Sequence, residues 1–249
     1  MLNFYIIGDI GNTDIKICVY KNKNIVKKIR LSTNKVNLKY LKKNLNVLRK
    51  YDKKLKQILF CSVVPNCYKK IKNYFKLYFN TNCNELKNLN LSKLLRIKVN
   101  KKQIGSDRLA NAISVIDNKN NYIVVDFGTA TTFDVIKNNK YYGGVIAPGI
   151  DLSLKTLSQK ASLIPNIKIT KTSKIIGRST ISSVNNGFFW GYVGLINNII
   201  KMITKESKTK YKIIFTGGLS SIFKKSVSFR PFVDKDLTLK GLFKIIKKI

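Results

Sequence analysis

Two short segments of the chain place acidic, glycine and hydroxyl residues in the same order. An apolar run near the start leads into residues 9–13 (Asp-Ile-Gly-Asn-Thr), and a second run leads into residues 126–131 (Asp-Phe-Gly-Thr-Ala-Thr). In such a turn the carboxylate can hold a metal ion, and the backbone N–H groups beside the glycine can reach a phosphate. Because the chain has 12 acidic residues against 48 basic ones, two acids placed alike indicate a shared task. The pattern predicts two turns that bind phosphate or metal.

Two other segments complete the set of residues that could do chemistry. Residues 216–220 (Thr-Gly-Gly-Leu-Ser) follow a predicted strand, and a glycine pair there lets an adenosine or a phosphate lie against the backbone. Residues 105–108 (Gly-Ser-Asp-Arg) open a predicted helix, where Arg108 can bind an anion bidentately. Transfer of a phosphoryl group to an alcohol needs a carboxylate that accepts the hydroxyl proton. Asp107 is the acid best placed for that role, and Asp134 is a lesser candidate.

Each motif also has a purely structural interpretation. Asp9 and Gly11 fit an Asx-type turn of a β-hairpin. Asp107 fits the first turn of a helix, where an acid stabilises the helix without any ligand. The repetition of the Asp-x-Gly pattern is what favours the functional interpretation.

The residue types that are missing exclude several classes of enzyme. The chain contains no histidine, so Ser-His-Asp and Cys-His nucleophile systems and histidine-ligated metal centres are ruled out. A general base near neutral pH must be a carboxylate or, less readily, a lysine or a tyrosine. The four cysteines form no Cys-x-x-Cys pair, which argues against a zinc site or a redox motif. Reduced thiols in a cytoplasmic protein are the expectation.

The formal net charge of +36 raises the question of nucleic-acid binding. The lysines are scattered through nearly every segment together with many Asn and Ile residues, a pattern that A/T-rich codons explain without a ligand. We therefore expect non-specific adhesion to polyanions and no specific nucleic-acid partner. No apolar run approaches the roughly 18 residues of a membrane span, and the N-terminal segment does not resemble a signal peptide, so no membrane association is expected.

The hydrophobic pattern predicts an α/β protein that repeats one plan. Apolar runs predict strands, and longer spaced patterns predict helices. The expected strands cover 4–9, 15–20, 25–31 and 58–64, then 122–126, 131–136, 141–146 and 212–215; the expected helices cover 36–51, 68–78 and 107–115, then 150–159, 179–203 and the C-terminal segment. The order βββαβα therefore occurs twice, which predicts a duplicated fold with halves 1–117 and 118–249 and a central cleft.

These motifs, taken in order, resemble a known family. Two Asp-x-Gly turns and a Thr-Gly-Gly turn resemble the actin, Hsp70 and sugar-kinase superfamily. The chain is more specifically similar to the type III pantothenate kinases in residues 9–13, 105–108, 126–132, 143–149 (Gly-Gly-Val-Ile-Ala-Pro-Gly), 176–180 (Ile-Gly-Arg-Ser-Thr) and 236–241 (Asp-Leu-Thr-Leu-Lys-Gly). The resemblance implies a ribonuclease H-like, actin-like ATPase fold with five-stranded halves.

The resemblance also implies an activity: phosphorylation of pantothenate by ATP to 4′-phosphopantothenate, the first step of coenzyme A biosynthesis. It implies Mg²⁺ with the ATP, a monovalent cation (K⁺ or NH₄⁺), and a homodimer. The helix that holds Trp190 and Tyr192 is a candidate dimer face, although ordinary core packing explains these side chains equally well. By family likeness Asp107 is the catalytic proton acceptor and Asp126 holds the cation; ATP is bound by Asp9, Ile10, Gly11, Asn12, Thr13, Asp14, Ile15, Lys16 and Thr129, and pantothenate by Gly105, Ser106, Asp107, Arg108 and Thr180.

The chain departs from the family pattern at two positions, and two alternatives stay open. Lys98 and Lys101 stand where the family usually carries a Tyr and a Pro. Lys98 either pairs with the pantothenate carboxylate or faces solvent. One alternative function is phosphorylation of another small alcohol. The other is nucleic-acid-binding regulation on a kinase-like scaffold, which the positive charge suggests.

Overall fold

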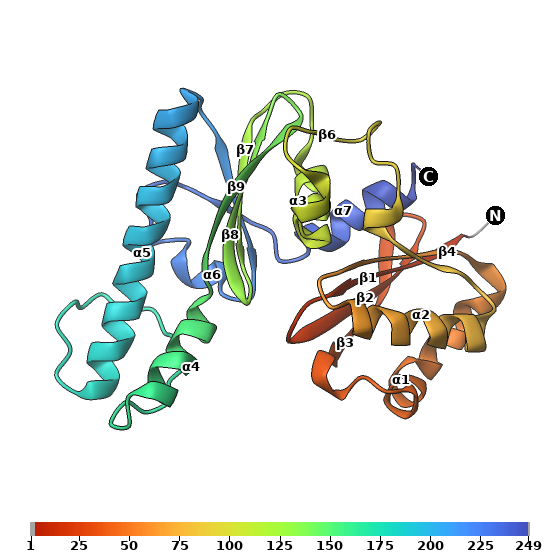
Figure 1. Ribbon diagram of the computed structural model, residues 1–249, viewed down its shortest axis with the longest axis horizontal. Helices are drawn as coiled ribbons and strands as arrows, with labels where there is room; N and C mark the ends of the chain where they lie inside the picture. Colours follow the sequence, from red (N-terminus) through yellow and green to blue (C-terminus); the bar gives the residue numbers. More distant parts are fainter. Residues whose placement is uncertain (1–2, 249) are drawn as a thin grey trace. The chain divides into compact units, whose positions relative to one another are not determined.

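The computed structural model describes residues 3–248 and divides into two compact units. Unit 1 comprises the chain up to Val115 together with the segment from Asp236 onward, and unit 2 comprises Ile116–Lys235. Each unit is built around its own β-sheet with helices packed on it (Figure 1). Among residues 3–248, no helix combines the length and the apolar character that crossing a membrane requires.

Unit 1 is organised by a five-stranded sheet with the order β3-β2-β1-β4-β5. The strands β1, β2 and β3 form an antiparallel meander, and β4 and β5 are added parallel to β1. The parallel strands are connected through helices, as parallel pairing demands. The strands are β1 (Phe4–Ile10), β2 (Asp14–Lys21), β3 (Asn24–Ser32), β4 (Leu55–Ser62) and β5 (Cys83–Glu85).

Helices cover both faces of this sheet. The helices α1 and α2 bury one face, where Ile6, Ile17 and Phe60 belong to the main apolar cluster. The helices α3 and α7 lie on the other face, and Phe243 of α7 stacks on Tyr20 of β2 with ring centroids 4.1 Å apart. The bounds are α1 (Leu38–Leu45, continued by a 3₁₀ segment Asn46–Lys54), α2 (Pro65–Phe79), α3 (Ser106–Val115) and α7 (Leu237–Ile246), with a short strand β6 (Arg96–Ile97) before α3.

Unit 2 repeats the same sheet topology. Its strands run in the order β11-β10-β7-β8-β9, with β7, β8 and β9 antiparallel and β10 and β11 parallel to β7. Its strands are β7 (Tyr122–Phe127), β8 (Ala130–Lys137), β9 (Lys140–Pro148), β10 (Lys212–Gly217) and β11 (Phe232–Val233); its helices are α4 (Ile150–Lys160), α5 (Thr180–Ser207) and the single turn α6 (Ser220–Phe223).

The sequence marks both ends of the long helix α5. Ser179 and Ser182 form a capping box at the start, and Lys208 adopts the left-handed conformation (φ 47°) at the end. Its buried side chains, including Phe189 and Ile196, join Phe133 of β8 in the core of unit 2. The α4–α5 pair therefore covers one face of the unit 2 sheet (Figure 1).

The duplicated α/β fold predicted from the sequence is confirmed, because the two sheets share one strand order and one pattern of strand directions. The structure differs from the sequence expectation in three details. The expected helix over 36–51 is α1 followed by a 3₁₀ segment. The edge strands β5 and β11 were not predicted. The C-terminal helix α7, expected in the second half, belongs to unit 1, whose contacts place the boundary after Val115.

Close packing explains why α7 belongs to unit 1. A Cβ added at Gly241 would lie 1.9 Å from the backbone oxygen of Ala110, so the α7 and α3 backbones approach as closely as a glycine permits. Thr238 donates a buried hydrogen bond of 2.8 Å to Asn111 Oδ1. The sequence motif over 236–241 thus has a structural role, which is to dock α7 on α3.

This packing predicts the effect of one added methyl group. Gly241→Ala forces the α7 and α3 backbones apart, and we expect it to lower the free energy of unfolding by about 1–3 kcal/mol, the usual cost of overpacking. Gly194→Ala is the matched control, since a Cβ at this α5 position meets no atom of the described chain within 4 Å. The control should gain roughly 0.5–1 kcal/mol from reduced backbone entropy. Urea unfolding of both variants is the measurement; equal stability would contradict the packing account.

Candidate active site

The first Asp-x-Gly turn joins β1 to β2 in unit 1. Gly11 N–H donates to Asp14 O (3.0 Å), and the Thr33 hydroxyl donates to Gly11 O (2.8 Å), which fixes the turn against β3. Asn12 and Thr13 are exposed at its tip, and Thr13 O accepts from Thr33 N–H (3.0 Å). Phosphate binding by this turn stays a prediction.

The other residues predicted to bind ATP here differ in what they can offer. The side chains of Ile10 and Ile15 are fully buried, so these residues can meet a nucleotide only through their backbone. Asp14 forms an ion pair with Arg30 on β3, which raises the pKa of that guanidinium through the hydrogen bond between them. Lys16 lies directly opposite Asp9 in the strand register, and opposed residues share a face of the sheet. Asp9 and Lys16 thus lie on one face of the sheet, which Asp14 and Arg30 share.

Asp107 lies in the first turn of α3, with its carboxylate folded over the preceding glycine. A Cβ at Gly105 would be 2.4 Å from Asp107 Oδ1, so glycine makes room for this carboxylate. The Arg108 backbone N–H donates to the same oxygen (2.8 Å). Burial raises the pKa of Asp107, and the Arg108 N–H opposes this shift without cancelling it. The group is therefore a stronger base than an ordinary aspartate.

A cysteine that sequence reasoning did not single out lies beside Asp9. Cys61 of β4 is paired with Asp9 in the parallel register, and its Sγ donates to Asp9 Oδ1 at 3.4 Å. Burial, and next the charges of Asp9 and Asp107, raise the pKa of the Cys61 thiol well above its ordinary value. The thiol is therefore neutral and acts as a donor. The signal in the sequence was its position at the end of the strand that becomes the parallel neighbour of β1.

Ser106 connects this strand to α3. Its buried hydroxyl accepts from Ser62 N–H (2.8 Å) and donates to Ser62 O (2.8 Å), so one side chain binds both backbone groups of one residue. The Ser106 hydroxyl, which was predicted to contact substrate, thus already forms two hydrogen bonds to the backbone of Ser62. Nearby, Glu85 is 9% exposed and accepts from Lys87 N–H (2.6 Å). Burial raises the pKa of Glu85, which lies close enough to Cys61 to raise the thiol's pKa in turn.

In unit 2 the second Asp-x-Gly turn meets the Thr-Gly-Gly segment. A Cβ at Gly217, whose φ is 86°, would lie 2.6 Å from Asp126 Oδ1. Gly218 N–H donates to Phe127 O (3.2 Å), which holds the two segments together. Thr132 faces Asp126 across the β7–β8 pair, and its hydroxyl is buried without a hydrogen-bond partner among the described residues. A carboxylate beside a buried free hydroxyl is an oxygen-rich environment suited to a cation.

The remaining candidates in unit 2 include two exposed threonines and two buried side chains. Thr129 lies at the tip of the second turn, and Thr180 is the first residue of α5. Tyr192 is 8% exposed and donates to Pro148 O (3.0 Å), which favours core packing over a dimer face for this side chain. Asp134 is fully buried and accepts from Tyr141 Oη (2.7 Å), as a structural group would. In unit 1, Lys98 is exposed.

The donor sets decide what kind of metal could be held. Within residues 3–248 no group of three or more Cys, Asp or Glu side chains is arranged to hold a metal ion. Mg²⁺ is compatible with this arrangement because it commonly uses one or two carboxylates together with the oxygens of a bound phosphate. Asp9, at the phosphate turn, is the carboxylate that fits that use.

Known proteins resemble this chain over nearly its whole length. The family model of the type III pantothenate kinases matches residues 5–202. The type III pantothenate kinase of Pelagibacter ubique (strain HTCC1062) is 55% identical over 240 residues, covering 96% of this chain and 97% of that protein.

Solved structures support the fold. A putative Baf family transcriptional activator from Campylobacter jejuni superposes with a TM-score of 0.63 at 22% identity, covering 98% of each chain. A putative sugar kinase from Cytophaga hutchinsonii ATCC 33406 gives a TM-score of 0.52 at 13% identity, covering 98% of this chain and 100% of that one. The family model covers most of the chain, and a family member is 55% identical over nearly its full length. The chain therefore belongs to the type III pantothenate kinase family.

Proposed function

We propose that this chain transfers the γ-phosphoryl group of ATP to the primary hydroxyl of pantothenate, with Asp107 as the proton acceptor. The hydroxyl oxygen bonds to the γ-phosphorus, the bond to the β,γ-bridging oxygen breaks, ADP leaves, and the hydroxyl proton passes to Asp107. Family membership supports the reaction. The site assignment is supported by two neighbouring residues of β4: Cys61 donates to Asp9, and Ser62 is bound by Ser106, the residue before Asp107.

The chain supplies mainly positioning and charge, as phosphoryl transfer requires. The Asn12 and Thr13 backbone at the tip of the first turn receives phosphate oxygens, and Lys16 neutralises part of their charge. Arg108 binds the acidic substrate bidentately. Mg²⁺, held by Asp9, would supply further neutralisation of phosphate charge when bound. Of the unit 2 residues, family likeness assigns Thr129 to ATP and Thr180 to pantothenate, and the Thr-Gly-Gly segment is suited to an adenosine.

The proposed binding site of the monovalent cation lies in unit 2. Asp126 provides a carboxylate, and the unpartnered Thr132 hydroxyl provides a second oxygen on the same sheet face. A buried hydroxyl without a partner is unfavourable in a folded protein. A bound K⁺ or NH₄⁺ ion would satisfy it, which supports placing the cation at Asp126.

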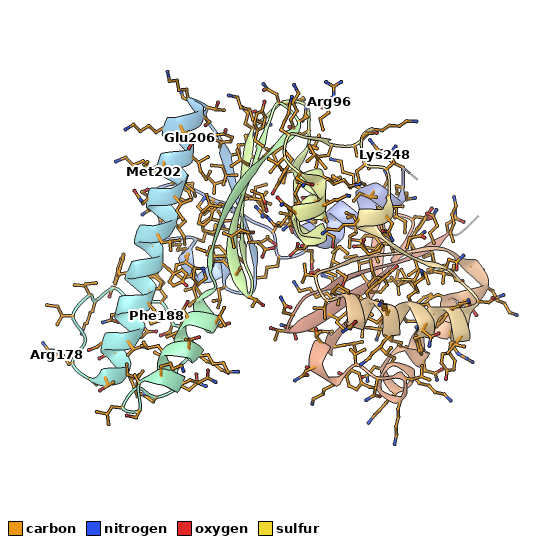
Figure 2. All side chains as sticks on the ribbon, viewed as in Figure 1. Arg96, Arg178, Phe188, Met202, Glu206 and Lys248 are labelled. Carbon is orange, nitrogen blue, oxygen red and sulfur yellow. The ribbon has the colours of Figure 1, made fainter. Side chains whose placement is uncertain are left out.

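The proposed homodimer uses the outer face of α5. Gly187 and Gly191 lie about one helical turn apart, and a Cβ at each would meet no atom of the described chain within 4 Å. Both glycines line a cavity of about 470 Å³ with a mostly apolar surface, together with Pro148, Tyr192 and Phe188. Phe188 is labelled on α5 in Figure 2. The face of α5 that carries Gly187, Gly191 and Tyr192, and not the one with Trp190, is therefore the part on which a second copy could pack.

The cysteines bear on where the protein works. All four carry free, buried thiols, which supports a reducing compartment such as the cytoplasm.

A related small-alcohol kinase is the second candidate function, because Lys98 replaces the Tyr usual in the family. The regulator hypothesis has weaker support, since the Campylobacter protein with a regulator-like name is 22% identical and shares the fold. ATP consumption tested with pantothenate and with other small alcohols separates the two kinase hypotheses.

Asp107→Asn should reduce kcat by roughly 10²- to 10⁴-fold, the usual contribution of a general base. Because burial penalises the charged carboxylate, the neutral amide should not lower stability, and the variant should unfold at or above the wild-type temperature. Steady-state pantothenate phosphorylation and thermal unfolding test both points. Wild-type turnover in Asp107→Asn would remove Asp107 from the proposed role.

The pH profile gives an independent check of the same residue. The carboxylate must be ionised to accept a proton, so kcat/KM for pantothenate should fall as pH decreases through the pKa of Asp107. That limb should lie above the ordinary value of 3.8 because burial raises the pKa. It should be missing from the residual activity of Asp107→Asn.

Thr132→Val tests the cation site. Removing a hydroxyl ligand while keeping the shape should raise the K⁺ concentration for half-maximal activity several-fold, on the order of one lost ligand hydrogen bond. Thr131→Val is the matched control, because the Thr131 hydroxyl is likewise buried and unpartnered among the described residues but faces the other side of the sheet. Equal K⁺ dependence in both variants would place the cation elsewhere.

Gly191→Arg tests the dimer face. The arginine has open space within one chain, so folding should be unaffected, whereas a second copy on α5 would be displaced. Light scattering should report a dimer for the wild type and a monomer for the variant. Leu77→Arg, which adds an arginine at a 61% exposed position on α2, should remain dimeric. A monomeric wild type at all concentrations tested would end this proposal.

A further inference from the structure

The end of β4 is bonded to Asp9 and to the residue that precedes Asp107. The Cys61 thiol donates to Asp9, and the next residue, Ser62, is bound through both of its backbone groups by Ser106, the neighbour of Asp107. We propose that Cys61 is a positioning residue that orients the Asp9 carboxylate for nucleotide binding. The inference rests on the proposed function, because Asp9 is assigned there to the ATP phosphates.

The geometry gives Cys61 this role for three reasons. Its side chain is fully buried, so it cannot swing away into solvent. It lies directly beside Asp9 in the β1–β4 register, on the same face of the sheet. Its Sγ lies 3.4 Å from Asp9 Oδ1, within the range of a hydrogen bond to sulfur. Asp9 is partly exposed, and a fixed donor on one carboxylate oxygen limits the rotamers in which that hydrogen bond is kept.

The strand end is itself anchored. Val63 N–H donates to Ile10 O (3.1 Å), which extends the β1–β4 pairing past Cys61. The two Ser106 bonds of 2.8 Å tie Ser62 to the start of α3. Cys61 therefore sits on a backbone that is held on both sides, and the position of its sulfur is set by the fold. Because the sulfur is held in place, its hydrogen bond to Asp9 can fix the orientation of that carboxylate.

Substitutions at Cys61 separate positioning from packing. Serine keeps a donor, and alanine removes the donor. Cys67→Ala is the matched control, because it removes a buried sulfur from α2, where Lys70 rather than an acid is the charged neighbour. Groups that orient a metal-binding or catalytic carboxylate typically contribute 10- to 100-fold to affinity or activity.

Steady-state kinetics is the first test. Cys61→Ala should raise the KM for ATP about tenfold, while the KM for pantothenate stays near that of the wild type. Cys61→Ser should restore most of the ATP affinity, and Cys67→Ala should leave both constants unchanged. If Cys61→Ala and Cys67→Ala change the constants equally, or if serine fails to rescue, Cys61 has a packing role only and the proposal is overturned.

The second test reads the hydrogen bond without any turnover. An infrared difference spectrum between the wild type and Cys61→Ala isolates the S–H stretching band of Cys61. The band should be shifted and broadened as for a hydrogen-bonded thiol, and in an Asp9→Ala background it should move to the position of an unbonded thiol. A band that does not move overturns the proposal. A wild-type protein without pantothenate kinase activity would instead refute the proposed function and leave this spectrum unaffected.

Discussion

The parallel pairing of β1 with β4 is the constraint on which the unit 1 site depends. It brings Cys61, far along the chain, level with Asp9 at the carboxyl edge of the sheet. It also places Ser62 where the Ser106 hydroxyl can bind both of its backbone groups. A shift of one residue in this register would turn Cys61 to the opposite face, because side chains alternate along a strand. The spacing of the two acids is therefore a property of the sheet.

Burial, rather than net charge, sets the chemistry of this region. The chain carries a formal charge of +36, yet Asp107, Glu85 and Cys61 all have pKa values raised chiefly by loss of water. Lysines on the surface are screened by solvent, whereas the acids act on one another through a less polar medium. A strongly basic protein can thus contain a site in which carboxylates are kept more basic than in water.

The repeated topology could be predicted because local sequence patterns, such as apolar runs and helix caps, mark most helices and strands of each half. The strands around Asp9 and Asp126 are long apolar runs, and α5 has a serine capping box at its start. The short strands β5 and β11 have no such pattern, since edge strands of two or three residues are defined by the neighbour they pair with. The contacts of Cys61 and Glu85 could not be predicted for the same reason: both depend on parallel pairings between distant segments. The place of α7 depends on the close approach of Gly241 to Ala110, which no local pattern encodes.

The discontinuity of unit 1 has a consequence for the order in which the protein can form. Unit 2 is a continuous segment, whereas unit 1 needs α7, which follows all of unit 2 in the chain. During synthesis, domains tend to fold as their residues emerge from the ribosome. Unit 2 can therefore fold first, while the helix α3 that carries Asp107 waits for its packing partner. The carboxylate of Asp107 gains its full surroundings only after unit 2 has been synthesised, so a chain that stops before α7 has both Asp-x-Gly turns but lacks the helix that packs on α3.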